Sequence, residues 1–193
     1  MEKLIQRKTI KNRLVNLSQT DRETYSKIIC DKLIDLVEKT KVNIIMSYRP
    51  IQKEVDVEKF NQYIEQKDVQ ICYPRIAGDD LVAISSKEFD LDQYGIRQPI
   101  NGITIDKKDI ELVIIPLIGF DENLNRLGRG KGYYDRFLEN TKALKVAVAY
   151  EIQKEEMIIT NEQDIKMDVI LTQEKDYGKD IREIKKLIVS SRA

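Results

Sequence analysis

Apolar side chains in the first forty residues recur at the spacing of two amphipathic helices. Residues 2–16 carry apolar positions roughly three or four apart, which predicts a first helix. A Ser-x-x-Asp pattern from Ser18 to Asp21 is typical of a helix start, so a second helix is predicted behind it. The apolar positions are Leu4, Ile5, Ile10, Leu14 and Leu17 in the first helix, and Tyr25, Ile28, Ile29, Leu33, Leu36 and Val37 in the second.

Short apolar runs then alternate with helical segments along the rest of the chain. Strands are predicted at 43–48, 69–73, 81–84, 112–117, 145–150 and 169–172, and helices at 55–66 and 133–140. In the first of these helices Phe60, Tyr63 and Ile64 are expected to point inward. The most apolar run, 112–117, is the best candidate for a central strand. The alternation predicts an α/β fold with one domain over residues 1–193: an open, mostly parallel sheet with helices on both faces, in three layers.

Composition narrows the class of protein. With 41% hydrophobic and 34% charged residues, the chain has the make-up of a soluble globular protein. Its 33 Lys and Arg balance 33 Asp and Glu, whereas nucleic-acid-binding domains usually have a basic excess. The first twelve residues lack the apolar core of a signal peptide, and no apolar run approaches the ~18 residues of a membrane span. We therefore expect a cytoplasmic protein.

The residues available for chemistry are restricted, because the chain contains no histidine. Ser-His, Cys-His and His-zinc chemistry are excluded, so catalysis has to use carboxylates, Lys, Arg, Tyr, backbone amides or a bound ion. Cys30 and Cys72 form no CxxC pair, and we expect two buried, reduced thiols rather than a zinc or redox site.

A polar loop follows the predicted central strand, at the edge of the sheet where α/β folds bind ligands. From Asn125 to Arg136 it reads NRLGRGKGYYDR, so three glycines alternate with Arg129 and Lys131 before a helix-like run. Glycines allow close backbone approach, and amides at a helix start together with cations suit a polyphosphate. Asp135 is a candidate ligand for a magnesium ion that bridges phosphate oxygens.

The loop matches neither common phosphate motif. No Gly lies five residues before the Gly130-Lys131 pair and no Ser or Thr follows, which excludes a P-loop, and the spacing G-x-G-x-G differs from G-x-G-x-x-G. On the residues alone three interpretations stay open: a phosphate site, a Gly-rich surface turn with solvated cations, or a basic-aromatic loop that contacts RNA.

Ten consecutive residues, RLGRGKGYYD from Arg126 to Asp135, resemble the signature of the 5-formyltetrahydrofolate cyclo-ligase family, also called 5,10-methenyltetrahydrofolate synthetases. The resemblance covers most of the chain. It includes Lys3 with Arg7, the segments 54–56, 73–75, 94–99 and 114–121, and Asp164 with Asp168. Two positions depart from the family pattern: Gln98 stands where many members carry Glu, and Gln163 where many carry His.

The resemblance implies the conversion of 5-formyltetrahydrofolate and MgATP to 5,10-methenyltetrahydrofolate, ADP and phosphate. It implies ATP binding by Lys3, Arg7, Arg126, Leu127, Gly128, Arg129, Gly130, Lys131, Gly132, Tyr133 and Tyr134, with Arg129 and Lys131 catalytic. It implies folate contacts by Tyr48, Glu54, Arg129, Gly130, Lys131, Gly132 and Tyr133, and magnesium ligation by Asp135 and Asp164. Arg75 and Tyr150 are further pocket candidates, and Asp168, just before the last predicted strand, is expected to be structural.

Simpler roles compete with these assignments. Lys3 and Arg7 are four apart and would also suit a solvated helix face, Glu54 a helix N-terminus, and Asp164 a loop or cap. For the whole protein we expect small-molecule partners, no nucleic acid, no membrane and a monomer. The alternatives are an ATP-dependent enzyme for another small substrate on the same scaffold, an RNA-binding module and a non-catalytic interaction domain.

Overall fold

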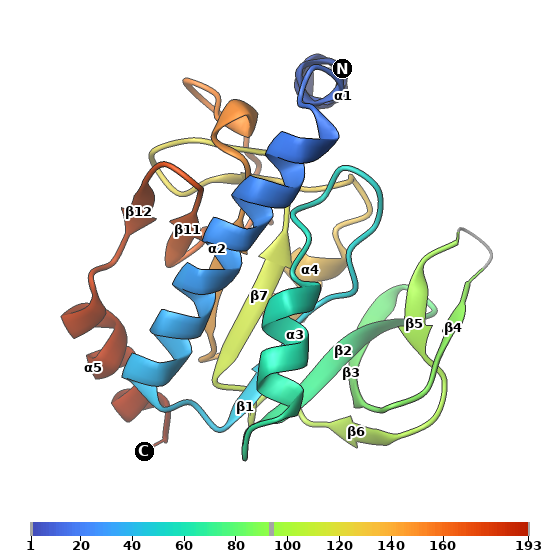
Figure 1. The fold of residues 1–193 in the computed structure, drawn as a ribbon, viewed down its shortest axis with the longest axis vertical. Helices are drawn as coiled ribbons and strands as arrows, with labels where there is room; N and C mark the ends of the chain where they lie inside the picture. Colours follow the sequence, from blue (N-terminus) through green and yellow to red (C-terminus); the bar gives the residue numbers. More distant parts are fainter. Residues whose placement is uncertain (1, 93–94, 193) are drawn as a thin grey trace.

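The chain is built around one eight-stranded sheet (Figure 1), in a computed structural model that describes residues 2–92 and 95–192. The strand order is β12 (Asp176–Gly178), β11 (Val169–Leu171), β10 (Leu144–Val148), β7 (Leu112–Pro116), β1 (Ile44–Met46), β2 (Gln70–Ala77), β3 (Asp80–Ser85) and β6 (Ile103–Ile105). The five strands from β11 to β2 are parallel, and the strands at the two edges are antiparallel. The expected open, mostly parallel sheet is confirmed.

The central strand β7 shows why the run 112–117 is so apolar. Side chains of a strand point alternately to opposite faces. Leu112 and Ile114 pack against the core beneath α2 (Gln19–Thr40), α3 (Glu58–Glu65) and α5 (Ile181–Arg192), while Val113 and Ile115 pack on the other face with α4 (Tyr133–Leu138). All four side chains are fully buried. The three-layer α/β/α arrangement follows, with most of the helical cover on one face.

Both predicted N-terminal helices are present. Ser18 caps α2, since its Oγ accepts a hydrogen bond from the Asp21 amide at 3.1 Å. The first helix, α1 (Glu2–Val15), lies beyond the carboxyl end of β7 (Figure 1) and buries Ile10 and Leu14. Three apolar positions expected to face the core are instead exposed, namely Leu4, Ile5 and Ile28. The first two lie in the half of α1 that does not rest on the core, so their spacing is helical without marking a buried face.

Element boundaries differ where tertiary contacts override local pattern. The helix predicted at 55–66 begins only at Glu58, because Val55 is held in a loop by a hydrogen bond from the Tyr48 hydroxyl at 2.7 Å. Strand β2 continues through Pro74 to Ala77, past the expected end. Its pairing with β1 stops at Cys72, so the missing amide of Pro74 breaks no bond on that side.

Several small elements were not predicted. A hairpin of β4 (Phe89–Leu91) and β5 (Arg97–Pro99) projects from the sheet (Figure 1), and β8 (Gly119–Phe120), just before the expected polar loop, pairs with β9 (Arg126–Leu127) inside it. The 3-10 helix η1 (Glu151–Gln153), β6, β12 and the whole of α5 were also missed. Asp168 directly precedes β11, as expected, but β11 is followed by one more strand, β12. Within residues 2–92 and 95–192, no helix is both long and apolar enough to cross a membrane.

Candidate functional site

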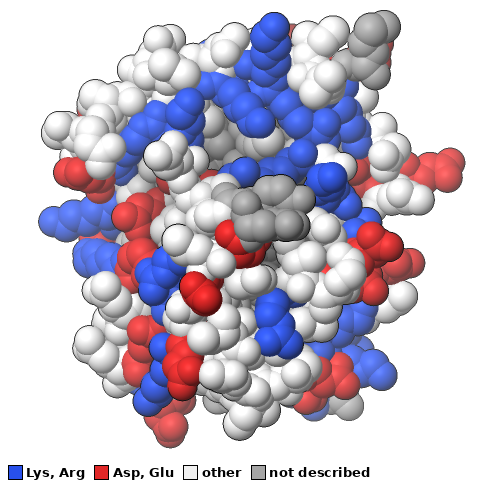
Figure 2. Space-filling view, turned by 90° about the vertical axis from the view of Figure 1, so that its right-hand side faces the viewer, with Lys and Arg blue, Asp and Glu red and all other residues white. Residues whose placement is uncertain are grey.

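A large cavity of about 1220 Å³ lies at the carboxyl ends of the central strands. Its floor includes Tyr48 after β1, Pro74 of β2 and Pro116 of β7. Figure 2 shows Lys and Arg side chains gathered across the upper part of this face, above a hollow. The cations that line the cavity are Lys3, Arg7, Arg49, Arg97, Arg126, Arg129, Lys131 and Arg136. So many positive groups around one concave surface favour an anionic ligand.

The segment after β7 reaches the cavity through the short β8–β9 ribbon. Buried Asp121 fixes the turn of this ribbon: its carboxylate accepts hydrogen bonds from the amides of Asn123 and Asn125 at 2.9 and 3.1 Å, and from the Ile158 amide at 2.9 Å. A carboxylate that accepts several amides is a strong anchor. The residues that follow, 125–132, form the Gly-rich loop. Because the turn before it is held by Asp121, the loop is fixed in position at the rim of the cavity.

Two glycines explain why the Gly-rich loop needs that residue type. Gly130 and Gly132 have φ of +103° and +67°, conformations that other residues rarely adopt. A Cβ on Gly130 would also lie 3.2 Å from Cζ of Arg7, whose Nε donates to the Gly128 carbonyl at 2.8 Å. The loop backbone and α1 are therefore in direct contact, with the loop exposed toward the cavity.

Three ion pairs join cations and carboxylates of the cavity. Arg129 Nη2 lies 2.7 Å from Glu54 Oε1, and Arg126 Nη2 lies 3.1 Å from Asp135 Oδ2. Lys3 pairs with Asp164 across the cavity mouth. Glu54 is not at a helix start, since α3 begins four residues later, so its carboxylate serves the cavity instead. Lys131 also lines the cavity, and within the described parts of the chain its amine has no ion-pair partner.

The two tyrosines of the cavity floor are neutral at physiological pH. Burial, followed by the negative charge of Glu54, raises the pKa of both Tyr48 and Tyr134 above the ordinary value. The Tyr48 hydroxyl is already committed to the Val55 carbonyl. Neither phenol is therefore suited to act as a general base.

Comparison with known proteins identifies the family. Residues 1–173 match the model of the 5-formyltetrahydrofolate cyclo-ligase family. The chain belongs to this family. A 5-formyltetrahydrofolate cyclo-ligase of Mycoplasma pneumoniae is 29% identical over 90% of this chain and 100% of its own length. One of Mus musculus is 30% identical over 86% of this chain and 90% of its own.

Solved structures agree with the family assignment. The structure of Aquifex aeolicus 5,10-methenyltetrahydrofolate synthetase has a TM-score of 0.83 and 31% identity, and it covers 92% of this chain and 93% of its own. The Mycoplasma pneumoniae 5,10-methenyltetrahydrofolate synthetase has a TM-score of 0.76 and 28% identity, covering 90% and 100%. The cyclo-ligase fold is thus shared along nearly the whole chain.

All fifteen residues expected to serve the cyclo-ligase site line this one cavity. They are Lys3, Arg7, Tyr48, Glu54, Arg126, Leu127, Gly128, Arg129, Gly130, Lys131, Gly132, Tyr133, Tyr134, Asp135 and Asp164. Gln98 and Gln163, which depart from the cyclo-ligase pattern, line it too. Tyr94 of the matched segment 94–99 lies outside the described residues.

Three other residues singled out in the sequence do not line the cavity: the pocket candidates Arg75 and Tyr150, and Asp168. Arg75 donates to the Ile100 carbonyl at 3.3 Å outside the cavity lining, and Tyr150 is buried, donating to the Glu54 carbonyl at 3.2 Å from behind the wall. Asp168 is paired with Lys145 and Lys179 at 3.0 and 2.6 Å, which supports the structural role expected for it.

The cyclo-ligase cavity also contains residues that sequence reasoning missed. Arg49, Arg136 and Arg97 line it. Arg97 stands inside the matched segment 94–99, and Arg49 directly follows Tyr48 at a strand end, so their positions were signals that went unused.

The carboxylates Asp135 and Asp164 fit a magnesium ion bound together with nucleotide. Asp135 Oδ1 accepts a hydrogen bond from the Ile165 amide at 3.3 Å, which brings α4 against the residue next to Asp164. In residues 2–92 and 95–192 there is no group of three or more acidic, Cys or His side chains placed to hold a metal. Magnesium commonly takes only one or two carboxylates and completes its shell with phosphate oxygens and water, so two are sufficient.

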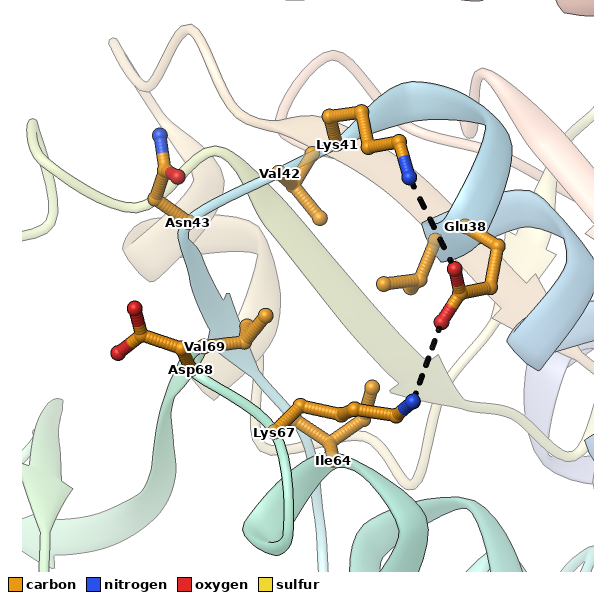
Figure 3. Close-up of a pocket in the computed structure, with 9 residues that line it drawn as sticks. Glu38, Lys41, Val42, Asn43, Ile64, Lys67, Asp68 and Val69 are labelled. Carbon is orange, nitrogen blue, oxygen red and sulfur yellow. Dashed lines mark ion pairs between the residues drawn. The ribbon is translucent and has the colours of Figure 1, made fainter.

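A second, smaller depression of about 290 Å³ lies at the opposite edge of the sheet, before β1 and β2 (Figure 3). Glu38 stands between Lys41 and Lys67, 3.8 Å from each, and with Asp68 the depression carries two acidic and two basic side chains. None of the residues that match the cyclo-ligase pattern lines it. The large cavity is therefore the candidate site.

Proposed function

We propose that this chain catalyses the ATP-dependent conversion of 5-formyltetrahydrofolate to 5,10-methenyltetrahydrofolate, with release of ADP and phosphate. One observation carries the proposal: the ten residues that match the family signature line the same cavity as Lys3, Arg7 and Glu54, which come from distant parts of the chain. Membership of the cyclo-ligase family supports the same reaction.

The cationic rim is assigned to the ATP phosphates. Lys3 and Arg7 reach the cavity from α1, and Arg129 and Lys131 from the Gly-rich loop. Exposed backbone amides of a Gly-rich turn and charged side chains are the groups that bind polyphosphates. Asp135 and Asp164 would hold magnesium, which when bound neutralises charge on the phosphate oxygens.

The apolar wall is assigned to the folate ring system. Aliphatic and aromatic side chains line this part of the cavity, among them Tyr48, Ile51, Pro74, Ile76, Leu81 and Ile96. Glu54, only 10% exposed at its side chain, is the acidic group beside them. Its carboxylate is suited to accept hydrogen bonds from the N–H groups of a pterin, while the apolar surface packs against the ring.

The chemical task is to activate a stable formamide. In the proposed reaction the formyl oxygen attacks the γ-phosphorus and the bond to ADP breaks. Nitrogen 10 then attacks the formyl carbon and closes the ring, its proton passes to the phosphate group, and the carbon–oxygen bond breaks to release phosphate. The attacking oxygen carries no proton, so no histidine is required, and Arg126, Arg129 and Lys131 act by positioning and by neutralising phosphate charge.

Ligand binding would exchange the partners of the cavity ion pairs. Without ligand, Glu54 is neutralised by Arg129, Asp164 by Lys3 and Asp135 by Arg126. The phosphates of ATP would then pair with the cations. Folate would bind Glu54, and magnesium would bind Asp135 and Asp164. The pairs thus keep the charged groups compensated until both substrates are present.

The protein is further proposed to act as a monomer in the cytoplasm on small molecules alone. The cytoplasmic location is supported because both cysteines are free and buried. An RNA-binding role has less support, since the loop cations Arg126 and Arg129 line a concave cavity and are ion-paired with Asp135 and Glu54.

The deciding test is the absorbance of methenyltetrahydrofolate formed from 5-formyltetrahydrofolate, with ATP and magnesium supplied or omitted singly. Product that requires both supports the proposal. Absence of product in the complete mixture, with ATP binding still measurable by calorimetry, rejects folate cyclisation and leaves an ATP-dependent enzyme for another substrate.

A further inference from the structure

The β4–β5 hairpin forms one side of the cavity but is separate from the main sheet. It is a two-stranded sheet of its own, and in the described part of the chain neither strand pairs with the eight-stranded sheet. The hairpin nevertheless contributes Ile96, Arg97 and Gln98 to the cavity, next to the apolar wall assigned to folate. Side-chain contacts therefore have to hold this outer wall in place.

Those contacts converge on Arg49, which follows β1. Its side chain is only 8% exposed, and its guanidinium forms ion pairs with Glu58 at 2.6 Å and Glu65 at 2.8 Å, both on α3. The same group lies against two aromatic rings, 4.3 Å from the centroid of Tyr73 on β2 and 4.4 Å from that of Phe89 on β4. One side chain thus connects α3, the main sheet and the hairpin.

The rings and carboxylates around Arg49 are themselves connected. Tyr73 and Phe89 pack edge-to-face with centroids 5.1 Å apart, and the Tyr73 hydroxyl donates to Glu65 at 2.6 Å. We call these five residues, Arg49, Glu58, Glu65, Tyr73 and Phe89, the Arg49 cluster. Phe89 is its member on the hairpin, and Phe89 does not line the cavity.

Only a guanidinium meets the geometry of this cluster. It is planar and carries several N–H donors, so it can lie against the adjoining rings of Tyr73 and Phe89 while its edge binds two carboxylates, whereas a lysine ammonium has no flat face and fewer fixed donors. The arrangement also has a cost, because the buried Nε of Arg49 finds no hydrogen-bond partner among residues 2–92 and 95–192. A buried charge of this kind is a poor way to gain stability alone, since apolar packing often serves as well.

We infer that Arg49 is a positioning residue for folate: it fixes the outer wall of the cavity by holding Phe89 of the hairpin against β2 and α3. The inference rests on the proposed function, which supplies the ligand. It concerns the folate side alone, because the cations and glycines assigned to ATP lie on α1 and the Gly-rich loop.

Two variants test the inference by changing either partner of the contact between Arg49 and Phe89. Arg49→Lys keeps the charge near Glu58 and Glu65 but removes stacking, and Phe89→Leu removes the ring from a residue that does not line the cavity. Both are expected to raise KM for 5-formyltetrahydrofolate about tenfold. We expect kcat and KM for ATP to stay within about twofold of wild type, and the double variant to add little to either single one.

Tyr73→Phe is the matched control. It keeps the ring that stacks on Arg49 and removes only the hydroxyl bonded to Glu65. We expect its KM for the folate to stay within about twofold of wild type. Amide hydrogen exchange over 89–99, measured without ligand, should speed up in Arg49→Lys and Phe89→Leu and remain near wild type in Tyr73→Phe.

The outcomes separate the explanations. A raised KM in Arg49→Lys with a normal KM in Phe89→Leu means that Arg49 acts by direct contact with the ligand, and it overturns the inference. Unchanged KM values with a lower kcat and melting temperature indicate a purely structural role and also overturn it. If wild type makes no product, the proposed function fails; unchanged hairpin exchange in both variants would reject the positioning role itself.

Discussion

Lys131 differs from the other cations of the Gly-rich loop because, among the residues that the structure describes, no carboxylate forms an ion pair with it. Arg126 and Arg129 are held by Asp135 and Glu54, whereas the Lys131 amine makes no ion pair in the described parts of the chain. A cation that makes no ion pair with the protein is available for phosphate at once. Its contribution should therefore appear in turnover rather than in folding.

For Lys131→Ala we expect a melting temperature close to wild type and a kcat lower by about 100-fold or more, the scale of losing one group that stabilises transition-state charge. Steady-state kinetics and thermal unfolding measure the two. Lys142→Ala is the control, since Lys142 is also exposed but lies outside the cavity. A Lys131→Ala enzyme with near-normal kcat would remove Lys131 from the catalytic machinery.

The two cysteines are expected to be inert in the folded protein. Burial raises the pKa of Cys30 to about 11 and that of Cys72 to about 12, and neither side chain is exposed. Since only the thiolate reacts, a thiol reagent at pH 8 should modify neither cysteine in the native state and both after unfolding. A colorimetric thiol count checks this, and rapid modification of the native protein would contradict the buried environment.

Individual functional residues could be predicted from the sequence where they stand next to one another in the chain. The cluster of Gly, Arg, Lys and Asp from 126 to 135 indicated a phosphate site, although the resemblance to a family was needed to choose it over a surface turn. The role of Arg49 was not predicted, because it depends on contacts with Tyr73 and Phe89. These two residues are far from Arg49 in sequence and contact it only in the folded chain.

Among the elements, the Gly-rich loop is the most sensitive to substitution. In Gly130→Ala the backbone would have to hold φ of +103° with a side chain present, and the new methyl group would press on Arg7. We expect a loss of about 1–3 kcal/mol in the free energy of unfolding, together with an increase of tenfold or more in KM for ATP, because the loop must shift. Chemical denaturation and initial rates measure the two effects.

Gly78 provides the comparison for Gly130. It lies in the turn between β2 and β3 with φ of +65°, and a Cβ there would meet no heavy atom within 4 Å. Gly78→Ala is therefore expected to lower stability through backbone strain while leaving KM for ATP unchanged. Equal KM values in the two alanine variants would show that the Gly-rich loop is not in contact with nucleotide.

Periodicity predicted the long elements and missed the short ones for a physical reason. Strands of two or three residues, such as β4 and β8, are too brief to show alternation and exist because of their partners. The C-terminal helix α5 is a different case. Buried Ile184 and Ile188 are four apart, and Asp180 accepts hydrogen bonds from the amides of Arg182 and Glu183, so a start signal and an apolar stripe were both present.

Across the whole molecule, Asp168 joins three strands at the edge of the sheet. It precedes β11, pairs with Lys145 on β10, and pairs with Lys179 just after β12. Burial alone would raise the pKa of this carboxyl. The hydrogen bonds from Lys179 and from the Lys145 amide outweigh burial and lower the pKa below its ordinary value of 3.8. The contribution to stability is then present above about pH 4 and is lost as pH falls through the folded-state pKa.

We expect Asp168→Asn to lower the free energy of unfolding by about 2 kcal/mol at pH 7, the cost of a lost charged hydrogen bond. The difference from wild type should stay constant from pH 5 to 8 and shrink below about pH 4. Urea denaturation at several pH values gives the curve. Asp176→Asn, at a carboxylate that is 57% exposed and paired with Lys32, should change stability by less than about 1 kcal/mol.

The overall architecture could be predicted from the sequence because many apolar runs and helical segments along the chain indicate the same fold class. Apolar runs separated by helical segments require a parallel sheet, and parallel strands place their following loops at one edge. The balance of cover on the two faces was not predictable, since it depends on α5 and on how the loops after β6 and β10 pack. The lining of the cavity by α1 needed the folded chain as well.

The contacts of α1 have a consequence for how the protein is made. Lys3 pairs with Asp164, Arg13 with Glu155, and Gln6 binds Met157 and Ile159, so α1 finds these partners some 140 to 160 residues later in the chain. Domains are assembled during synthesis as their parts emerge. The nascent chain thus carries the Gly-rich loop before segment 155–164, which holds Lys3 and Arg13 of α1, and it should acquire tight nucleotide binding only after that segment has emerged. A product truncated before residue 155 would fold around an incomplete pocket and would not sequester ATP.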